Sequence, residues 1–237
     1  MRLFIYMCLC LLPLKVSGQA DDARALSIGL FYSPGVSYRQ LNFSSTDGWI
    51  EKVRNGDEIP KYSFSTGAKI GFTIRDRVRV VTGLMFTNRG ERTKETQLTW
   101  PTSSQAYPQS SRSVFSYRYL ELPLQVMYAI HKKQRLGLYL IGGVSFNLLL
   151  NKATKVELEF PDGDRQTIKS SKSAGNNRFG LCTSFGLEAS YKLTDKISLL
   201  IGPTFHRSIT SAVVNKNAKE YQYAVFMTVG LVKMFQR

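Results

Sequence analysis

The stretch Lys61-Tyr-Ser-Phe-Ser-Thr-Gly-Ala-Lys-Ile-Gly-Phe-Thr-Ile-Arg75 alternates its residue types with a period of two. Aromatic and aliphatic side chains dominate the even-numbered positions, and small or charged side chains occupy the odd-numbered ones. Because successive side chains of a β-strand point to opposite faces, the stretch predicts a strand with one apolar and one polar face. A barrel wall between lipid and a polar interior has this pattern.

The same alternation recurs along the chain and predicts eight strands. Their ranges are 26–40, 61–75, 78–89, 114–130, 136–150, 178–192, 197–208 and 221–235. Several reach roughly 12 to 16 residues, which exceeds the usual soluble strand of about 5 to 6 and the tilted membrane strand of about 9 to 11. The fifth range is apolar on both faces in places, so a buried helix is an alternative there. Gly137, Gly142 and Gly143 disfavour it, since glycine costs about 1 kcal/mol in a helix interior.

The gaps between these ranges alternate between short and long. Short gaps fall at Asp76, 131–135 and 193–196, and long polar gaps fall at 42–60, 91–112, 151–177 and 210–220. This alternation is typical of periplasmic turns and extracellular loops. Asp162-Gly163-Asp164 resembles a calcium-loop fragment, but a hairpin tip explains it better.

The predicted fold class is therefore all-β: an eight-stranded antiparallel up-and-down transmembrane beta-barrel with short periplasmic turns and longer extracellular loops. The alternative is a soluble lipocalin-like barrel, in which the apolar face points inward. The long aromatic-rich strands and the terminal Phe235 favour the membrane barrel, and they predict the outer membrane as its location.

Residues 1–20 have the features of a signal peptide, which leaves 21–237 as a single barrel domain. Arg2 precedes an apolar segment, 3–14, that is too short to span a bilayer, and small residues follow it. Two cysteines leave with this leader, and neither follows a convincing lipoprotein cleavage pattern. Cys182 alone remains, so we expect no intrachain disulfide and a small buried residue.

The formal net charge is +15, which indicates anionic partners. An exported chain meets little nucleic acid, so outer-membrane lipid, lipopolysaccharide, acidic surface polymers or an envelope protein are the expected partners. The simpler alternative is solvated lysines and arginines without a specific ligand. The basic positions in the predicted loops are Lys52, Arg54, Arg92, Lys94, Lys152, Lys155, Lys169 and Lys172.

The inward face of the predicted barrel carries polar side chains. They are Lys69, Glu121, Gln125, Asn147, Ser184, Glu188, Thr204 and His206. Because buried charges need partners, we expect Glu121 and Glu188 to meet Lys69, Arg79 or Arg89. A polar network of Lys69, Glu121, Gln125, Glu188 and His206 would fill a lumen of this size as a structural plug. An ion or proton path is the alternative, and an open pore is not expected.

The sequence predicts no enzyme, no cofactor and no metal site. His206 and Ser208 share a strand face, as in a membrane esterase or deacylase, but no motif supplies the orienting acid. There is no Cys/His cluster with metal-ligand spacing and no glycine-rich phosphate loop before a helix.

The segment Tyr117-Arg-Tyr-Leu-Glu-Leu-Pro-Leu-Gln125 carries the most specific pattern in the chain. It resembles the "YLE-x-P" strand of the small outer-membrane beta-barrel proteins of Bacteroidetes, the PorT-like group. The segments 138–143 and 230–235 extend this resemblance over about residues 25–235. It implies the barrel fold and the outer membrane. One branch of the group is tied to a secretion system, so an accessory role in outer-membrane secretion or transport is the alternative function. Because Pro123 cannot donate a ladder hydrogen bond, we also predict a bulge or local break there.

Overall fold

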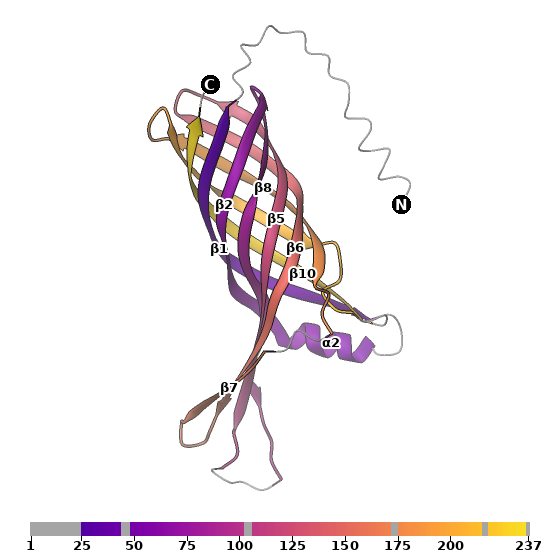
Figure 1. Ribbon diagram of the computed structural model, residues 1–237. Helices are drawn as coiled ribbons and strands as arrows, with labels where there is room; N and C mark the ends of the chain where they lie inside the picture. Colours follow the sequence, from indigo (N-terminus) through magenta and orange to yellow (C-terminus); the bar gives the residue numbers. More distant parts are fainter. Residues whose placement is uncertain (1–24, 44–47, 102–105, 172–174, 215–217, 236–237) are drawn as a thin grey trace.

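The structure is a computed structural model that describes residues 25–43, 48–101, 106–171, 175–214 and 218–235 (Figure 1). Eight long strands form a ring. They are β1 (Leu26–Phe43), β2 (Glu58–Arg75), β3 (Val78–Thr93), β5 (Ser110–Lys132), β6 (Leu136–Glu159), β8 (Phe179–Lys192), β9 (Ile197–Ser208) and β10 (Ala218–Phe235). The remaining elements are α2 (Gly48–Asp57), β4 (Thr96–Gln97) and β7 (Arg165–Ser171). The predicted signal peptide at 1–20 lies outside the described residues.

The ring closes where the first and last strands pair. β1 runs antiparallel to β10 from the pair Leu26 and Phe235 to the pair Phe43 and Ala218. Every other pair of ring neighbours is also antiparallel. The expected eight-stranded up-and-down barrel is therefore confirmed.

The outer surface of the barrel is apolar along its spanning part. The exposed positions are the even-numbered residues of β1, β2 and β5 and the odd-numbered residues of β8, β9 and β10, as the alternation predicted. Leu30 is 70% exposed and Phe179 is 75% exposed. Apolar side chains of this exposure point away from the lumen, which excludes the inverted, lipocalin-like arrangement.

The long gaps are not simply loops, and that expectation was wrong for three of them. Residues 48–57 form the helix α2, residues 110–113 extend β5 beyond its pairing with β3, and residues 151–159 extend β6 beyond its pairing with β8. β4 pairs with β5, and β7 pairs with β6, so these strands build a four-stranded sheet, hereafter the arm (Figure 1). Both faces of the arm meet water, so its sequence lacks the apolar alternation that marked the other strands.

The backbone decides three local predictions. Residues 136–150 lie in β6, so the helix alternative is wrong. The β3–β5 ladder is interrupted opposite Pro123 while the register stays the same on both sides, which confirms a local break without a bulge. Gly163, with a φ of 86°, lies in the turn between β6 and β7, which confirms the hairpin tip.

No helix within these described ranges is long and apolar enough to cross a membrane.

Two adjacent glycines in β6 provide a test of how closely the strands pack. A Cβ atom on Gly143 would lie 2.3 Å from the carbonyl oxygen of Leu124, whereas a Cβ on Gly142 would meet nothing within 4 Å. We therefore expect Gly143→Ala to lower the free energy of unfolding by about 1–3 kcal/mol, the usual cost of overpacking. Gly142→Ala should leave it almost unchanged. Urea unfolding of each variant in detergent, followed by heat-modifiable gel mobility, gives the midpoints to be compared. Equal midpoints for the two variants would contradict the predicted close approach.

Candidate functional site: the lumen and its two ends

The central lumen holds the predicted polar residues in two groups. In the first group, Lys69 Nζ donates to Gln125 Oε1 at 3.3 Å, and Gln125 Nε2 donates to Ser184 Oγ at 2.9 Å. Glu188 lines the same small cavity as Lys69. The ammonium group of Lys69 also lies 4.7 Å from the centre of the Phe31 ring.

Arg89 organises the second group. Its Nη2 lies 2.5 Å from Glu121 Oε1 and 3.4 Å from His206 Nδ1, and its Nη1 lies 3.5 Å from Cys182 Sγ. Glu121 therefore meets one of the cations expected for it. Glu188 is buried, but no ion pair joins it to another charged residue in the described part of the chain. Cys182 is fully buried, as predicted.

The cavity beside Lys69 has a volume of only about 20 Å³, which is room for about one water molecule. Apolar side chains fill the lumen around it in two clusters. One contains Phe31, Met85, Leu200 and Val232, and the other contains Val81, Met127 and Ile141. The lumen at this level is thus a packed core of mixed polarity, not the mainly polar interior that the alternation indicated.

The outer end of the barrel contains an ionic cluster that the sequence analysis missed. Arg39 contacts Glu58, lies 2.7 Å from Glu220 and lies 3.2 Å from Glu91. All four side chains are at most 4% exposed. Arg39 follows Ser33 and Ser37 on the inward face of β1, so the same alternation would have found it.

This outer cluster has three carboxylates around one guanidinium. Arg54 of α2 adds a partly exposed cation, with Nη2 at 3.3 Å from Glu58. Among the described residues, no hydrogen bond reaches either carboxylate oxygen of the buried Glu91, although Arg39 forms an ion pair with it. The cluster joins β1, β2, β3 and β10 to α2 and closes the lumen towards the extracellular side.

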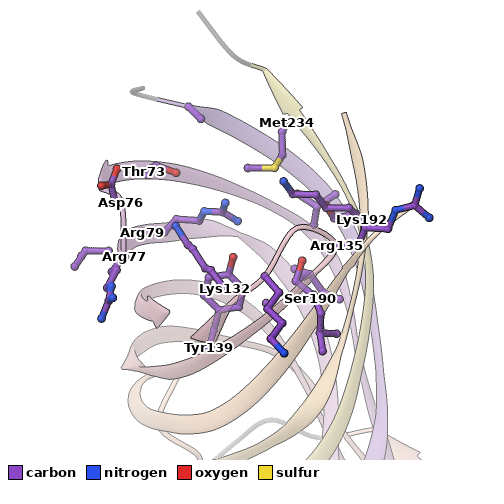
Figure 2. Close-up of a pocket in the computed structure, with 18 of the residues that line it drawn as sticks. Thr73, Asp76, Arg77, Arg79, Lys132, Arg135, Tyr139, Ser190, Lys192 and Met234 are labelled. Atoms are coloured by element: carbon purple, nitrogen blue, oxygen red, sulfur yellow. The ribbon is translucent and has the colours of Figure 1, made fainter. Parts of the chain in front are cut away.

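The periplasmic end of the barrel is different, because it opens into a cavity of about 230 Å³ (Figure 2). Short turns and both termini mark this end as periplasmic. The cavity is lined by seven cationic side chains and two acidic ones. The cations are Arg75, Arg77, Arg79, Lys132, Lys133, Arg135 and Lys192, and the acids are Asp76 and Asp195. We call this cavity the periplasmic mouth.

Strand geometry turns three of these cations towards the lumen. Arg79 of β3 lies opposite Thr73 of β2 in the ladder. The residues of β2 on the same face as Thr73 point inward, so Arg79 points inward as well. A β-bulge between Ala129 and His131 shifts the phase of β5, so that Lys132 lies opposite the buried Gly137. Lys192 of β8 lies opposite the buried Ser198.

These cations repel one another. Burial lowers the pKa of the Lys132 ammonium, and Arg79, Arg77 and Lys192 lower it further, while Asp76 acts in the opposite direction. None of the seven cations forms an ion pair with another residue that the structure describes. The guanidinium of Arg79 instead lies 6.0 Å from the centre of the Tyr139 ring.

The basic residues predicted for the extracellular loops are partly neutralised within the chain. Arg54 and Lys155 pair with Glu58 and Glu157, and the latter contact lowers the pKa of the Glu157 carboxyl. Lys94 Nζ donates to the Gly56 carbonyl, and Lys152 lies over the Tyr117 ring. Lys52, Arg92 and Lys169 make no ion pair within the described ranges, and Lys172 lies outside them.

The described residues give no support to a catalytic or metal centre. His206 packs edge-on against Phe226, with ring centroids 5.2 Å apart, and Ser208 Oγ accepts a hydrogen bond from the backbone N–H of Gln222. His206 and Ser208 share no hydrogen bond in this part of the chain. Among the described residues, no three His, Cys, Asp or Glu side chains are placed to hold a metal ion.

A closed ring of long antiparallel strands with an apolar outer surface defines the class of outer-membrane β-barrel proteins. Within that class, the family model described as "Outer membrane protein beta-barrel domain" matches residues 19–214. The chain belongs to this family and lies in the outer membrane. No curated protein matches the sequence.

Solved structures with a similar fold include Neisserial surface protein A, the protease OmpT from Escherichia coli and the attachment invasion locus protein Ail of Yersinia pestis. Neisserial surface protein A is 11% identical, with a TM-score of 0.45 over 89% of this chain and 97% of that chain. OmpT is 10% identical, with a TM-score of 0.44 over 92% and 99%. Ail is 12% identical, with a TM-score of 0.36 over 90% and 99%.

Arg39 provides a test of the outer cluster. Arg39→Met leaves three buried carboxylates without their shared cation, so we expect the free energy of unfolding to fall by about 3–5 kcal/mol. Arg165→Met is the matched control, because Arg165 is largely exposed and its pair with Glu159 should contribute little. Urea midpoints measured in the same detergent compare the two. A similar loss in both variants would show that the cluster does not hold the outer end together.

Proposed function

We propose that this protein is an outer-membrane interaction protein whose arm binds an extracellular protein partner. The observation that carries this proposal is the arm itself. β5 has 23 residues and β6 has 24, whereas a tilted membrane strand needs about 9 to 11. Roughly half of this hairpin therefore projects beyond the bilayer, where it serves no spanning purpose.

The arm ends in an open strand edge. Among the described residues, β7 pairs with β6 alone, and all seven of its residues are exposed. An edge strand presents unpaired N–H and C=O groups, which favour the addition of an extended segment from another protein. Within β7, Ile168 is 50% exposed and offers an apolar contact beside these groups.

The charge of the arm favours binding of an acidic or polar protein segment over binding of a polyanion. Arg112, Lys155 and Arg165 are paired with glutamates of the arm. Within the described ranges, Lys169 of β7 and Arg92 of β3 form no ion pair, so a limited number of cations in this region remains for lipopolysaccharide or a glycan. A partner strand carrying carboxylates beside β7 would meet Lys169 directly.

Proline substitutions at adjacent positions of β7 test this proposal. Successive backbone N–H groups of a strand point to opposite edges, so Ile168→Pro and Lys169→Pro remove donors from different sides. The variant that loses an open-edge donor should reduce retention of an extracellular protein by cells displaying the barrel about tenfold or more, while the arm stays folded. The other variant should weaken the β6–β7 pairing itself, which hydrogen exchange of β6 amides would detect.

The matched control reverses charge at the opposite end of the molecule. Lys133→Glu with Lys196→Glu alters two exposed periplasmic cations and should leave surface retention unchanged. Lys52→Glu with Lys169→Glu makes the same change on the extracellular side and should reduce it. Equal retention by all these variants would contradict the proposal.

A role as an accessory component of outer-membrane secretion is a second candidate, in line with the resemblance to the PorT-like group. The cationic periplasmic mouth favours it, because a component acting from the periplasm would use the short turns. Under this proposal, Asp76→Lys, His131→Glu and Asp195→Lys should reduce the amount of exported protein in the medium, with barrel assembly unchanged. Normal export by cells carrying these variants would contradict it.

A further inference from the structure

We propose that the periplasmic mouth is a binding site for a phosphate-bearing anion. The site goes beyond the proposed extracellular interaction and does not depend on it. It consists of Arg79, Lys132 and Lys192, which three different strands turn towards one cavity of about 230 Å³ (Figure 2).

The cations of this site lie on the inner side of the barrel wall. Cations at the rim of an outer-membrane barrel often contact lipid headgroups outside the wall. Here the bulge in β5 turns Lys132 to the inward face, and Ile130, the residue displaced by that bulge, is 50% exposed on the outer face. Lys132 therefore points to the cavity, as Arg79 and Lys192 do, rather than to the surrounding lipid.

The lining of the mouth has an excess of positive charge. Seven cations and two acids line the mouth, and the cations have no ion-pair partners among the described residues. The mutual repulsion of these cations raises the free energy of the unbound barrel. A bound anion lowers that free energy, which favours binding. The outer end of the barrel has the opposite arrangement, with carboxylates in excess around Arg39. The charge balance of the mouth therefore favours a negative ligand.

The arrangement of the donor groups in the mouth fits a phosphate group. Arg79 approaches from β3, Lys132 from β5 and Lys192 from β8, so the donors approach from different sides of the cavity. A carboxylate has two acceptor oxygens in one plane. A phosphate group has oxygens in tetrahedral directions and carries nearly two negative charges as a monoester. Guanidinium groups such as that of Arg79 bind such oxygens in pairs.

The floor of the mouth limits how far the anion enters. Arg79 lines both the mouth and the cavity of about 20 Å³ beneath it, next to Glu188. The buried carboxylate of Glu188 and the packed apolar side chains below Arg79 prevent deeper entry. The ligand is therefore held at the mouth and reaches it from the periplasm, either as a soluble phosphate compound or as the headgroup of an inner-leaflet lipid.

Calorimetry with inorganic pyrophosphate tests the site. The full-length mature barrel is placed in phosphatidylcholine nanodiscs, which leave both ends accessible. We expect one pyrophosphate per barrel, with an affinity that falls as salt rises. Lys132→Gln with Lys192→Gln should weaken it about tenfold or more, as should Arg79→Gln, because each removes charge-assisted hydrogen bonds. The first variant alters only exposed rim side chains, so its barrel should assemble normally.

The matched control is Lys52→Gln with Lys169→Gln, which removes the same charge from the extracellular end and should leave the affinity unchanged. Undetectable binding to the wild-type barrel, or an equal loss in the control, would overturn the proposal. Tighter binding of a tetraglutamate peptide than of pyrophosphate would also overturn it, in favour of an acidic protein segment.

A second set of nanodiscs, containing phosphatidic acid, separates the two sources of phosphate. If the natural ligand is a lipid headgroup, phosphatidic acid should compete with pyrophosphate in the wild-type barrel. If it is a soluble compound, the affinity for pyrophosphate should stay the same in both kinds of disc. Either result supports a phosphate site and identifies the side from which the ligand comes.

Discussion

The pairing of β1 with β10 is the contact on which the rest of the structure depends. Inside a bilayer no water is available to backbone N–H and C=O groups, so a sheet is stable there only when every strand has two neighbours. The antiparallel ladder from Leu26 to Phe43 removes both edges at once. Closure fixes the barrel at eight strands, and that number makes the lumen narrow enough for side chains to fill.

A filled lumen separates the two ends of the molecule. Between them lie the apolar clusters around Phe31 and Val81 and the ion pair of Arg89 with Glu121. The outer end is closed by carboxylates around Arg39, whereas the periplasmic end is open and cationic. The two ends thus face different compartments and differ in the charge that surrounds the lumen, which favours separate roles for the extracellular arm and the periplasmic mouth.

The alternation of residue types was sufficient for the barrel because lipid outside and a packed lumen inside impose period two on every spanning strand. It was not sufficient where both faces of a strand meet water. The arm strands around Ser111 and Thr154 carry no such contrast, so they were expected to be loops. They pair because they extend the same β5–β6 hairpin, with a one-residue register shift between Arg118 and Tyr119.

The candidate sites also combine features that the sequence predicts with features that only the tertiary structure shows. The sequence by itself determined which side chains face the lumen, among them Glu121 and Gln125, because the period of a strand assigns each residue to a face. It did not determine which of them meet, since partners such as Arg39 and Glu220 are 181 residues apart and are joined only by closure of the ring. It also did not reveal that Lys132 points into the periplasmic mouth. A one-residue bulge reverses the face of every residue after it, and only the tertiary structure, through the register of β5 against β6, decided where that reversal occurs.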